Sequence, residues 1–390
     1  MLTKNQKLID KIKKLLQVNE IYFFQNPLLI KITALTDNIG NFIFKKNKEA
    51  NFDKILISNI GHLGDLLLSL KFIEIMKEKF PNSKIYFLCN IQAKSLLINN
   101  PNINKIITYN PFFVNENENF FKKLVSLIKT IFKIKKTKAD IAFDLRSSFP
   151  NTIPLLKLGG IKYIVGFPTV GFGFLLDKKI AWDTEKHEIE NIFNLIRWKF
   201  DICEFSKDNN LNISYFGKES SDIKKLIEKI KNNYILCNIF SRNTKKMINL
   251  DSWEKVIKYY NRKYYIIITG SKDDNLKLVE KFIRLDKVIN LTGRTTISDL
   301  IYILKNAKFT ITIDSFIGQL CSILDIPSAI IFKGFVNIKR FGPLGKNCHI
   351  ILSNVECLPC YNTTLYKSCN AQKCGDLELL SEIIKINPLI

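Results

Sequence analysis

The sequence predicts an α/β protein with two doubly wound domains that face each other across a cleft. Two series of short apolar strands alternate with amphipathic helices, and a looser, more polar stretch from about 167 to 233 separates them. Such alternation is typical of parallel sheets covered by helices on both faces. The length of 390 residues also fits two domains better than one.

The first series begins with a strand predicted over 54–59, KILISN, followed by a glycine-containing turn and a helix over 65–80. Further strands are predicted over 84–89, 105–109, 140–145 and 162–167. Because amphipathic residues at helical spacing precede this series, we expect a helical extension over 1–50 and a first domain over 51–215.

The second series defines a second domain over 216–390. Strands are predicted over 234–240, 264–270, 287–293, 309–314 and 328–332. Helices are predicted between them over 251–261, 272–284, 298–306 and 315–324. Ligands of open parallel sheets bind beyond the carboxyl ends of the strands, so we expect one ligand in each domain, as in a two-substrate transferase.

The charge is strongly positive, with 59 basic and 36 acidic side chains and a formal net charge of +23. An apolar content of 46% excludes a disordered chain. The cations are 52 Lys and only 7 Arg. Because nucleic-acid readers rely on the bidentate arginine fork, we expect no nucleic-acid partner, although a non-catalytic basic module remains an alternative.

No segment reaches the roughly 20 apolar residues of a membrane-spanning helix, and residues 1–17 lack the compact apolar core of a signal peptide. We therefore expect a cytoplasmic protein. Nine cysteines, an odd number, fit a reducing compartment better than a disulfide framework.

The turn after the first strand reads Gly61-His62-Leu63-Gly64-Asp65. A glycine-rich strand-to-helix turn lets a ligand approach the backbone amides. Asp65 stands where a helix N-cap is expected, so capping explains it as well as a catalytic carboxylate does.

The turn at 61–65 belongs to the first of four sequence segments that together indicate a family. They are ILISNIGHLGDLLLSLKFIEIMKEKFPNSKIYFL, ADIAFDLRSS with GGIKYIVGF, NIFSRNTKKMINLDSWEKVI, and TGRTTISDLIYILKNAKFTITIDSFIGQLCSILDIPSAIIF with RFGPLG. Over about 54–350 the chain resembles glycosyltransferase family 9, the ADP-heptose:lipopolysaccharide heptosyltransferases. The resemblance implies a GT-B fold with two Rossmann-like domains, the acceptor in the first and the nucleotide sugar in the second.

The resemblance further implies inverting, metal-independent transfer of heptose from ADP-heptose to the lipopolysaccharide or lipooligosaccharide inner core. Asp65 matches the family's base. Lys246 or its neighbour Lys245 matches its donor-domain lysine, and Ser241 or Arg242 matches the preceding phosphate contact. Phe316 and Gln319 replace the family's usual Gly and His, which puts the identity of the donor sugar in doubt.

Other candidates follow from their positions at strand ends. Asp314 and Ser315 open a helix whose amides could hold phosphate, and Gly270 and Gly293 each follow a strand where a nucleotide could approach. Gly61, His62, Gly64 and Arg146 are candidates for acceptor binding. Each also has a structural explanation: solvation for the lysines, capping for Ser315, turn geometry for the glycines and a surface salt bridge for Arg146.

Four thiols lie close together in the sequence: Cys357, Cys360, Cys369 and Cys374. Their spacing suits a structural zinc or iron site, and four uncoordinated thiols are the alternative. Some members of the family that glycosylate proteins carry such a cluster, so a protein (autotransporter-type) heptosyltransferase, or a transferase for another nucleotide sugar, is the alternative function. Catalysis itself is expected to need no cofactor.

Residues 120–138, FFKKLVSLIKTIFKIKKTK, form a basic amphipathic pattern. Such a helix usually covers a sheet, and it could also rest on an anionic membrane. The expected partners are a nucleotide sugar, a lipid A-core acceptor and the inner-membrane surface, where the protein would be peripheral.

Overall fold

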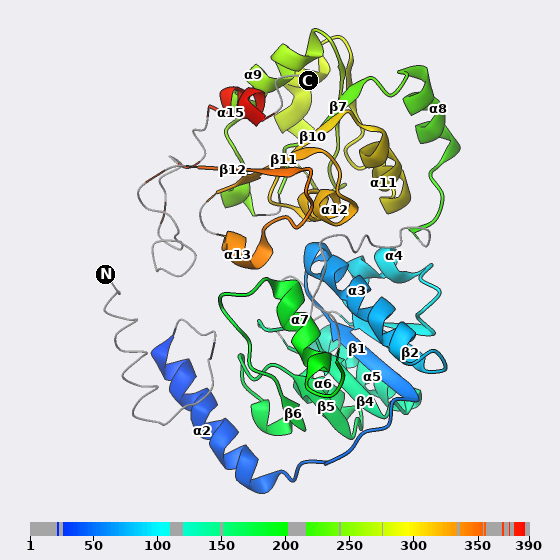
Figure 1. Cartoon of the computed structure of the whole chain (residues 1–390), viewed down its shortest axis with the longest axis vertical. Helices are drawn as coiled ribbons and strands as arrows, with labels where there is room; N and C mark the ends of the chain where they lie inside the picture. Colours follow the sequence, from blue (N-terminus) through cyan, green and yellow to red (C-terminus); the bar gives the residue numbers. More distant parts are fainter. Residues whose placement is uncertain are drawn as a thin grey trace. The chain divides into compact units, whose positions relative to one another are not determined.

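The computed structural model describes residues 22, 26–109, 120–148, 151–201, 216–241, 243–274, 276–333, 336–353, 355, 369, 374 and 378–386 (Figure 1). The chain divides into two compact units, Met1–Phe205 (unit 1) and Ser206–Ile390 (unit 2). None of the helices in the described ranges has the length and apolarity needed to cross a membrane.

Unit 1 contains one six-stranded sheet in which all neighbouring strands are parallel, in the order β3-β2-β1-β4-β5-β6. The strands are β1 (Lys54–Asn59), β2 (Lys84–Cys89), β3 (Lys105–Thr108), β4 (Ile141–Asp144), β5 (Tyr163–Gly166) and β6 (Lys178–Lys179). The central strand β1 pairs Ser58 with Leu88 of β2 and with Asp144 of β4. The carboxyl ends of β1 and β4 therefore lie side by side.

Helices cover both faces of this sheet. They are α2 (Pro27–Ile43), α3 (Leu63–Lys79), η1 (Ile91–Ala93), α4 (Lys94–Leu97), α5 (Phe120–Thr137), α6 (Ile153–Leu158), η2 (Gly173–Leu175) and α7 (Glu188–Arg197). On one face, Leu56 and Ala142 of the strands share a core with Ile134 of α5 and Leu156 of α6. On the other face, Phe72 of α3 packs edge-on against Phe143 of β4, with ring centroids 5.4 Å apart.

Unit 2 repeats this topology with a sheet in the order β12-β11-β10-β7-β8-β9, again parallel throughout. Its strands are β7 (Tyr234–Asn238), β8 (Tyr265–Ile268), β9 (Val288–Asn290), β10 (Phe309–Ile313), β11 (Ser328–Phe332) and β12 (Cys348–Leu352). Its helices are α8 (Ser221–Lys229), η4 (Thr244–Lys246), α9 (Leu250–Asn261), η5 (Leu276–Val279), α10 (Glu280–Ile283), α11 (Ile297–Asn306), α12 (Phe316–Leu324), α13 (Ile338–Phe341) and α15 (Leu379–Ile386).

Both sheets reverse their strand order at one point, between β1 and β4 in unit 1 and between β7 and β10 in unit 2. Helical connections leave toward opposite sides at such a switch point, so a crevice opens beyond the carboxyl ends of the two strands. This arrangement confirms the predicted α/β fold with two Rossmann-like units, and it identifies two strand edges where ligands can bind.

Two predicted elements need correction. The first helix begins at Leu63 rather than Asp65, so its N-cap is His62 and not Asp65. Asp65 still contributes to capping from the third helical position, where its side chain accepts a hydrogen bond from the His62 N–H. The single helix predicted over 272–284 is replaced by η5 and the short α10. The preceding segment instead turns at Ser271, whose N–H donates to Asp274 Oδ2 over 2.6 Å.

Candidate functional site

The turn that follows β1 is fixed by two asparagines. Asn59 Oδ1 accepts the N–H of Gly61 over 2.9 Å, while Asn59 Nδ2 donates to Ser69 Oγ of α3 over 2.8 Å. Asn90, which follows β2, donates its side-chain amide to the Gly61 carbonyl. The turn is thus tied to both neighbouring segments, which gives the residues it carries a defined position.

Asp65 lies at the third position of α3, directly beyond this turn. Its Oδ2 accepts the His62 N–H at 3.2 Å and lies 3.4 Å from Nη1 of Arg146. Among the described residues, both contacts use Oδ2, so Oδ1 keeps its lone pairs for another partner. With 37% of its side chain exposed, Asp65 can both cap α3 and accept a proton from a ligand hydroxyl.

Arg146 comes from the loop after β4, across the switch point from Asp65. Its Nε and Nη2 donate to the carbonyl and hydroxyl oxygens of Ser148, over 3.3 and 3.0 Å. Only 10% of its side chain is exposed. A Cβ at Gly61 would overlap both Arg146 Nη1 and Asp65 Oδ2, so glycine is needed here to leave room for the ion pair.

Asp144 lies beneath Arg146 at the end of β4 and is fully buried. Burial is the main influence on its carboxyl group and raises its pKa to about 6, although hydrogen bonds from the Thr152 and Arg146 N–H groups oppose the shift. A buried carboxyl group at the switch point therefore titrates near neutral pH.

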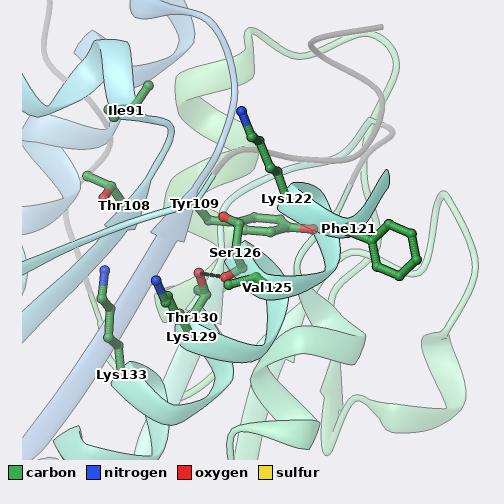
Figure 2. Close-up of a pocket in the computed structure, with 10 residues that line it drawn as sticks. All are labelled: Ile91, Thr108, Tyr109, Phe121, Lys122, Val125, Ser126, Lys129, Thr130 and Lys133. Carbon is green, nitrogen blue, oxygen red and sulfur yellow. Dashed lines mark hydrogen bonds between the residues drawn. The ribbon is translucent and has the colours of Figure 1, made fainter. Parts of the chain in front are cut away.

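A cavity of about 500 Å³ opens between α5 and the carboxyl ends of β2 and β3 (Figure 2). It is lined by Ile91, Thr108, Tyr109, Phe121, Lys122, Val125, Ser126, Lys129, Thr130 and Lys133. Figure 2 shows Lys129 and Lys133 extending from α5 toward the side where Thr108 lies. Since the described lining residues include three lysines and no acid, the cavity suits an anionic group.

In unit 2, Lys246 and Asp314 meet at the corresponding switch point. Lys246 Nζ, from η4 after β7, lies 2.5 Å from Oδ2 of Asp314, which directly follows β10. The Lys246 and Asp314 side chains are 26% and 10% exposed. The ion pair holds an ammonium group at the strand edge while leaving part of it accessible.

Ser315 is the N-cap of α12, and its backbone is extended. Its hydroxyl does not cap the helix; it donates to Oδ1 of Asn238 over 3.2 Å. Asn238 ends β7 and donates its own amide to the Thr269 carbonyl over 2.9 Å. The helix α12 thus begins two residues after Asp314, the ion-pair partner of Lys246, and the N–H groups of a helix N-terminus suit a phosphate group.

The other predicted donor residues occupy the same unit with different surroundings. Gly270 and Gly293 lie in the loops after β8 and β9 and are joined by a 2.9 Å hydrogen bond from the Gly293 N–H to the Gly270 carbonyl. Gln319 donates to the Phe341 carbonyl over 2.9 Å, which ties α12 to α13. Ser241 Oγ accepts the Asn243 N–H and so shapes the loop before η4, which also contains Lys245. Arg242 lies outside the described residues.

The predicted cysteine site falls largely outside the described part of the chain. Cys357 and Cys360 are not described, and Cys369 and Cys374 are half-buried. Within the described ranges, no three His, Cys, Asp or Glu residues are grouped closely enough to hold a metal ion. The metal site stays a prediction.

Sequence reasoning missed the polar groups that support both sites. Asn59 and Asn90 hold the unit 1 turn, and Asn238 holds Ser315. Lys333, at the end of β11, is buried and donates to the Met247 carbonyl over 2.8 Å. The signal available in the sequence was a polar residue at the last position of an apolar strand or directly after it, at the edge where parallel sheets bind their ligands.

Comparison with known proteins identifies the family of the chain. The sequence profile of glycosyltransferase family 9 (heptosyltransferase) matches residues 128–370, more than half of the chain. Lipopolysaccharide heptosyltransferase 3 of Escherichia coli K12 is 22% identical over 279 residues, which cover 69% of this chain and 79% of that protein.

Solved structures share the fold. A family 9 glycosyltransferase from Veillonella parvula superposes with a TM-score of 0.64 at 18% identity, covering 78% of this chain and 87% of the other. An E. coli heptosyltransferase in complex with ADP-2-deoxy-2-fluoro heptose superposes with a TM-score of 0.63 at 12% identity, covering 86% and 99%. The two parallel sheets thus form a GT-B fold, and the chain belongs to glycosyltransferase family 9, the heptosyltransferases.

Proposed function

We propose that this glycosyltransferase moves a heptose from ADP-heptose to the inner core of lipopolysaccharide or lipooligosaccharide, with inversion and without a catalytic metal. The observation that carries the proposal is the family match over 128–370. It is supported by the E. coli relative that bears the name of a lipopolysaccharide heptosyltransferase and by the neighbour solved with an ADP-heptose analogue.

Asp65 acts as the general base in this proposal. Its carboxylate takes the proton of an acceptor hydroxyl while the hydroxyl oxygen bonds to the anomeric carbon of the sugar. The bond from that carbon to the diphosphate oxygen breaks, and ADP leaves with the electron pair. Attack opposite the leaving group inverts the anomeric centre. Arg146 holds the carboxylate through Oδ2, so Oδ1 is the oxygen that receives the proton.

The diphosphate gains negative charge as it leaves, and unit 2 contains positively charged and hydrogen-bond-donating groups that would stabilise this charge. Lys246 supplies an ammonium group, and the amides at the start of α12 supply hydrogen-bond donors. Preorganised donors and cations of this kind can stabilise a diphosphate leaving group without a metal ion. Lys333, buried at the end of β11, keeps the Met247 segment beside this edge.

The acceptor is proposed to bind along the strand edge of unit 1. The lysine-lined cavity beside β3 would hold its anionic groups, while Asp65 reaches the reactive hydroxyl. An acceptor anchored in lipid would place the enzyme at the cytoplasmic face of the inner membrane.

A donor screen tests the proposal. Thermal unfolding of the full chain is measured with ADP-heptose, ADP-glucose and UDP-sugars, because a ligand that binds only the native state raises Tm, and a tighter ligand at the same concentration raises it more. A shift with ADP-heptose that is absent with UDP-sugars supports the donor assignment. Transfer to an inner-core acceptor must then yield the inverted linkage in the presence of EDTA.

The cysteine cluster is proposed to hold a structural zinc or iron ion, and this proposal rests on sequence spacing alone. Elemental analysis of the purified protein, compared with a Cys369→Ser/Cys374→Ser variant, tests it. Bound metal in the parent protein, together with transfer to a protein acceptor, would favour the protein heptosyltransferase instead.

A further inference from the structure

The helix α2, in the segment that precedes the first strand, packs on unit 1 through one face. Its Gly40 lies so close to Phe174 that a Cβ would overlap the phenyl ring. Phe44, which ends the helix, also contacts Phe174, with ring centroids 5.2 Å apart. The Tyr22 hydroxyl donates to buried Asp37 over 2.8 Å. The contacts with Phe174 attach α2 to the rest of unit 1, and the Tyr22 bond joins α2 to the segment before it.

The segment that follows α2 fixes it further. Lys46 Nζ donates to the carbonyls of Phe174 and Leu176 over 2.6 and 2.5 Å, and the Asn47 N–H donates to Asp177 over 2.8 Å. The rotation of α2 about its own axis is therefore set by packing. The side chains on its other face are exposed, and Figure 1 shows the helix, in blue, at the periphery of unit 1.

That outer face is apolar along its whole length. Its large exposed side chains are Leu28, Leu29, Ile32, Leu35, Ile39, Phe42 and Ile43. Five of them, at 28, 32, 35, 39 and 42, form a single stripe at helical spacing, called here the α2 stripe. Leu35 is 59% exposed and Phe42 is 94% exposed. A stripe of this length is far more than the scattered exposed leucines of an ordinary surface.

The charges around the α2 stripe are mostly positive. Between residues 26 and 49 the exposed charged side chains are Lys31, Lys45, Lys46, Lys48 and a single acid, Glu49, while Asp37 is buried. The same unit carries α5, which has six lysines and no acid and also exposes Phe121 and Phe132. Exposed apolar side chains among lysines are typical of helices that lie in the headgroup region of an anionic membrane.

We infer that the α2 stripe inserts into the interfacial layer of an anionic lipid bilayer and docks unit 1 on the membrane. A second copy of the chain is a poorer occupant, because a two-fold contact would bring like-charged lysine clusters together. The inference deepens the proposed function, since it names the surface through which the enzyme would reach a lipid-anchored acceptor. Membrane docking rests on the proposed function only for its biological role, because vesicle binding can be measured without any transfer reaction.

Vesicle binding by the full chain tests this inference. Co-sedimentation is measured with phosphatidylcholine vesicles with and without phosphatidylglycerol, for the parent protein and for Leu35→Asp/Ile39→Asp. Each buried Leu or Ile contributes about tenfold to partitioning, so the double variant should lose at least about 100-fold in binding. The matched control, Thr36→Asp/Asn38→Asp, adds the same charge at exposed positions beside the α2 stripe and should change binding by less than about tenfold.

The outcomes separate membrane docking from the alternatives. Equal vesicle binding by the parent and the stripe variant overturns the inference. A lipid-free dimer that the stripe variant dissociates overturns it too, in favour of a second copy. Transfer to a delipidated acceptor fragment should be the same in both proteins, so failure of the proposed reaction leaves the vesicle result interpretable.

A second measurement keeps the test valid if the charged variant folds poorly. Phe42→Trp places an indole at the most exposed position of the α2 stripe. Its fluorescence, after subtraction of the parent spectrum, should shift to the blue on addition of phosphatidylglycerol vesicles and be quenched by brominated lipid. An unshifted, unquenched signal in the presence of bound vesicles would contradict insertion.

Discussion

Arg146 Nη1 lies 3.4 Å from Asp65 Oδ2, and this ion pair joins the segments that follow the two central strands of unit 1. Arg146 is nearly buried and is held by Ser148, whereas Asp65 is more exposed. The arginine therefore acts as a fixed support and the carboxylate as the group that a ligand can reach. Because Asp65 is partly exposed and the contact is long, water weakens the contribution of this pair to stability, and we assign it mainly to positioning the carboxylate.

Replacing Arg146 with Lys keeps the positive charge but removes the fork that contacts Asp65 and Ser148 together. We expect kcat to fall about tenfold to a hundredfold, because a displaced carboxylate no longer meets the acceptor hydroxyl correctly. KM for the nucleotide sugar should change little, since the donor is proposed to bind in unit 2. Steady-state kinetics with both substrates varied measure kcat and the donor KM separately. A rise in the donor KM with kcat unchanged would contradict the prediction.

Gly61→Ala should act on the same ion pair from the other side. The new methyl group would occupy the space of Arg146 Nη1 and Asp65 Oδ2, so the two side chains must separate. We expect a loss of about 100-fold in kcat/KM. The effects of Gly61→Ala and Arg146→Lys should be strongly non-additive in the double variant, because both disturb one interaction. Additive losses would show that Gly61 acts elsewhere.

Lys246→Ala should lower donor kcat/KM by about 10²- to 10³-fold, because a cation that opposes the leaving diphosphate is removed. The change also deprives Asp314 of its ammonium partner, so stability must be followed in parallel. Lys246→Ala/Asp314→Ala should recover stability without recovering donor use. Lys258→Ala, which removes an exposed lysine of α9, serves as the control. If Lys245→Ala has the larger effect, the donor role belongs to that neighbour.

The pKa of Asp144, raised by burial to about 6, predicts a pH-dependent stability. Because the folded state binds this proton more tightly than the unfolded state, the contribution of Asp144 to the free energy of unfolding is greatest below about pH 4 and is lost as the pH rises through about 6. A shift of this size corresponds to about 3 kcal/mol. Asn resembles the protonated form, so Asp144→Asn should lack this decrease. Urea unfolding across this pH range measures the free energy of unfolding of both proteins. If this free energy changes with pH in the same way for both, the prediction is contradicted.

The sequence predicts strand cores better than strand ends. β1, β2 and β11 match their predicted ranges, because continuous apolar runs are buried on both faces of a parallel sheet. The edge strands β6 and β12 were not predicted. β6 consists of two lysines, and the short apolar run of β12, at 350–352, is largely exposed, so neither has the long buried run of a central strand. These edge strands are defined by their pairing with β5 and β11, which the local sequence does not reveal.

The site was predictable where a residue type and a strand end coincided. Asp65 was identified in this way, in the turn after its strand, whereas Lys246 or its neighbour Lys245 was identified only from the family resemblance. The structure places Asp65 and Lys246 at the two switch points. Their partners, Arg146 and Asp314, lie 81 and 68 positions away in the chain. Only the order of strands in the folded sheet brings such residues together. The supporting asparagines were missed because several of the residues they contact are also brought near them only by the folded sheet.

The central claim is that the Asp65 carboxylate is the base that activates the acceptor. Asp65 also caps α3, so the decisive measurement compares it with Asp299, which occupies the same capping position in α11. Both Asp65→Asn and Asp299→Asn are expected to cost about 1 kcal/mol of stability at most. With ADP-heptose and an inner-core acceptor, Asp65→Asn should lower kcat by about 10²- to 10⁴-fold, whereas Asp299→Asn should leave it near the parent value. Equal turnover by the two variants would contradict the role of Asp65 as the base.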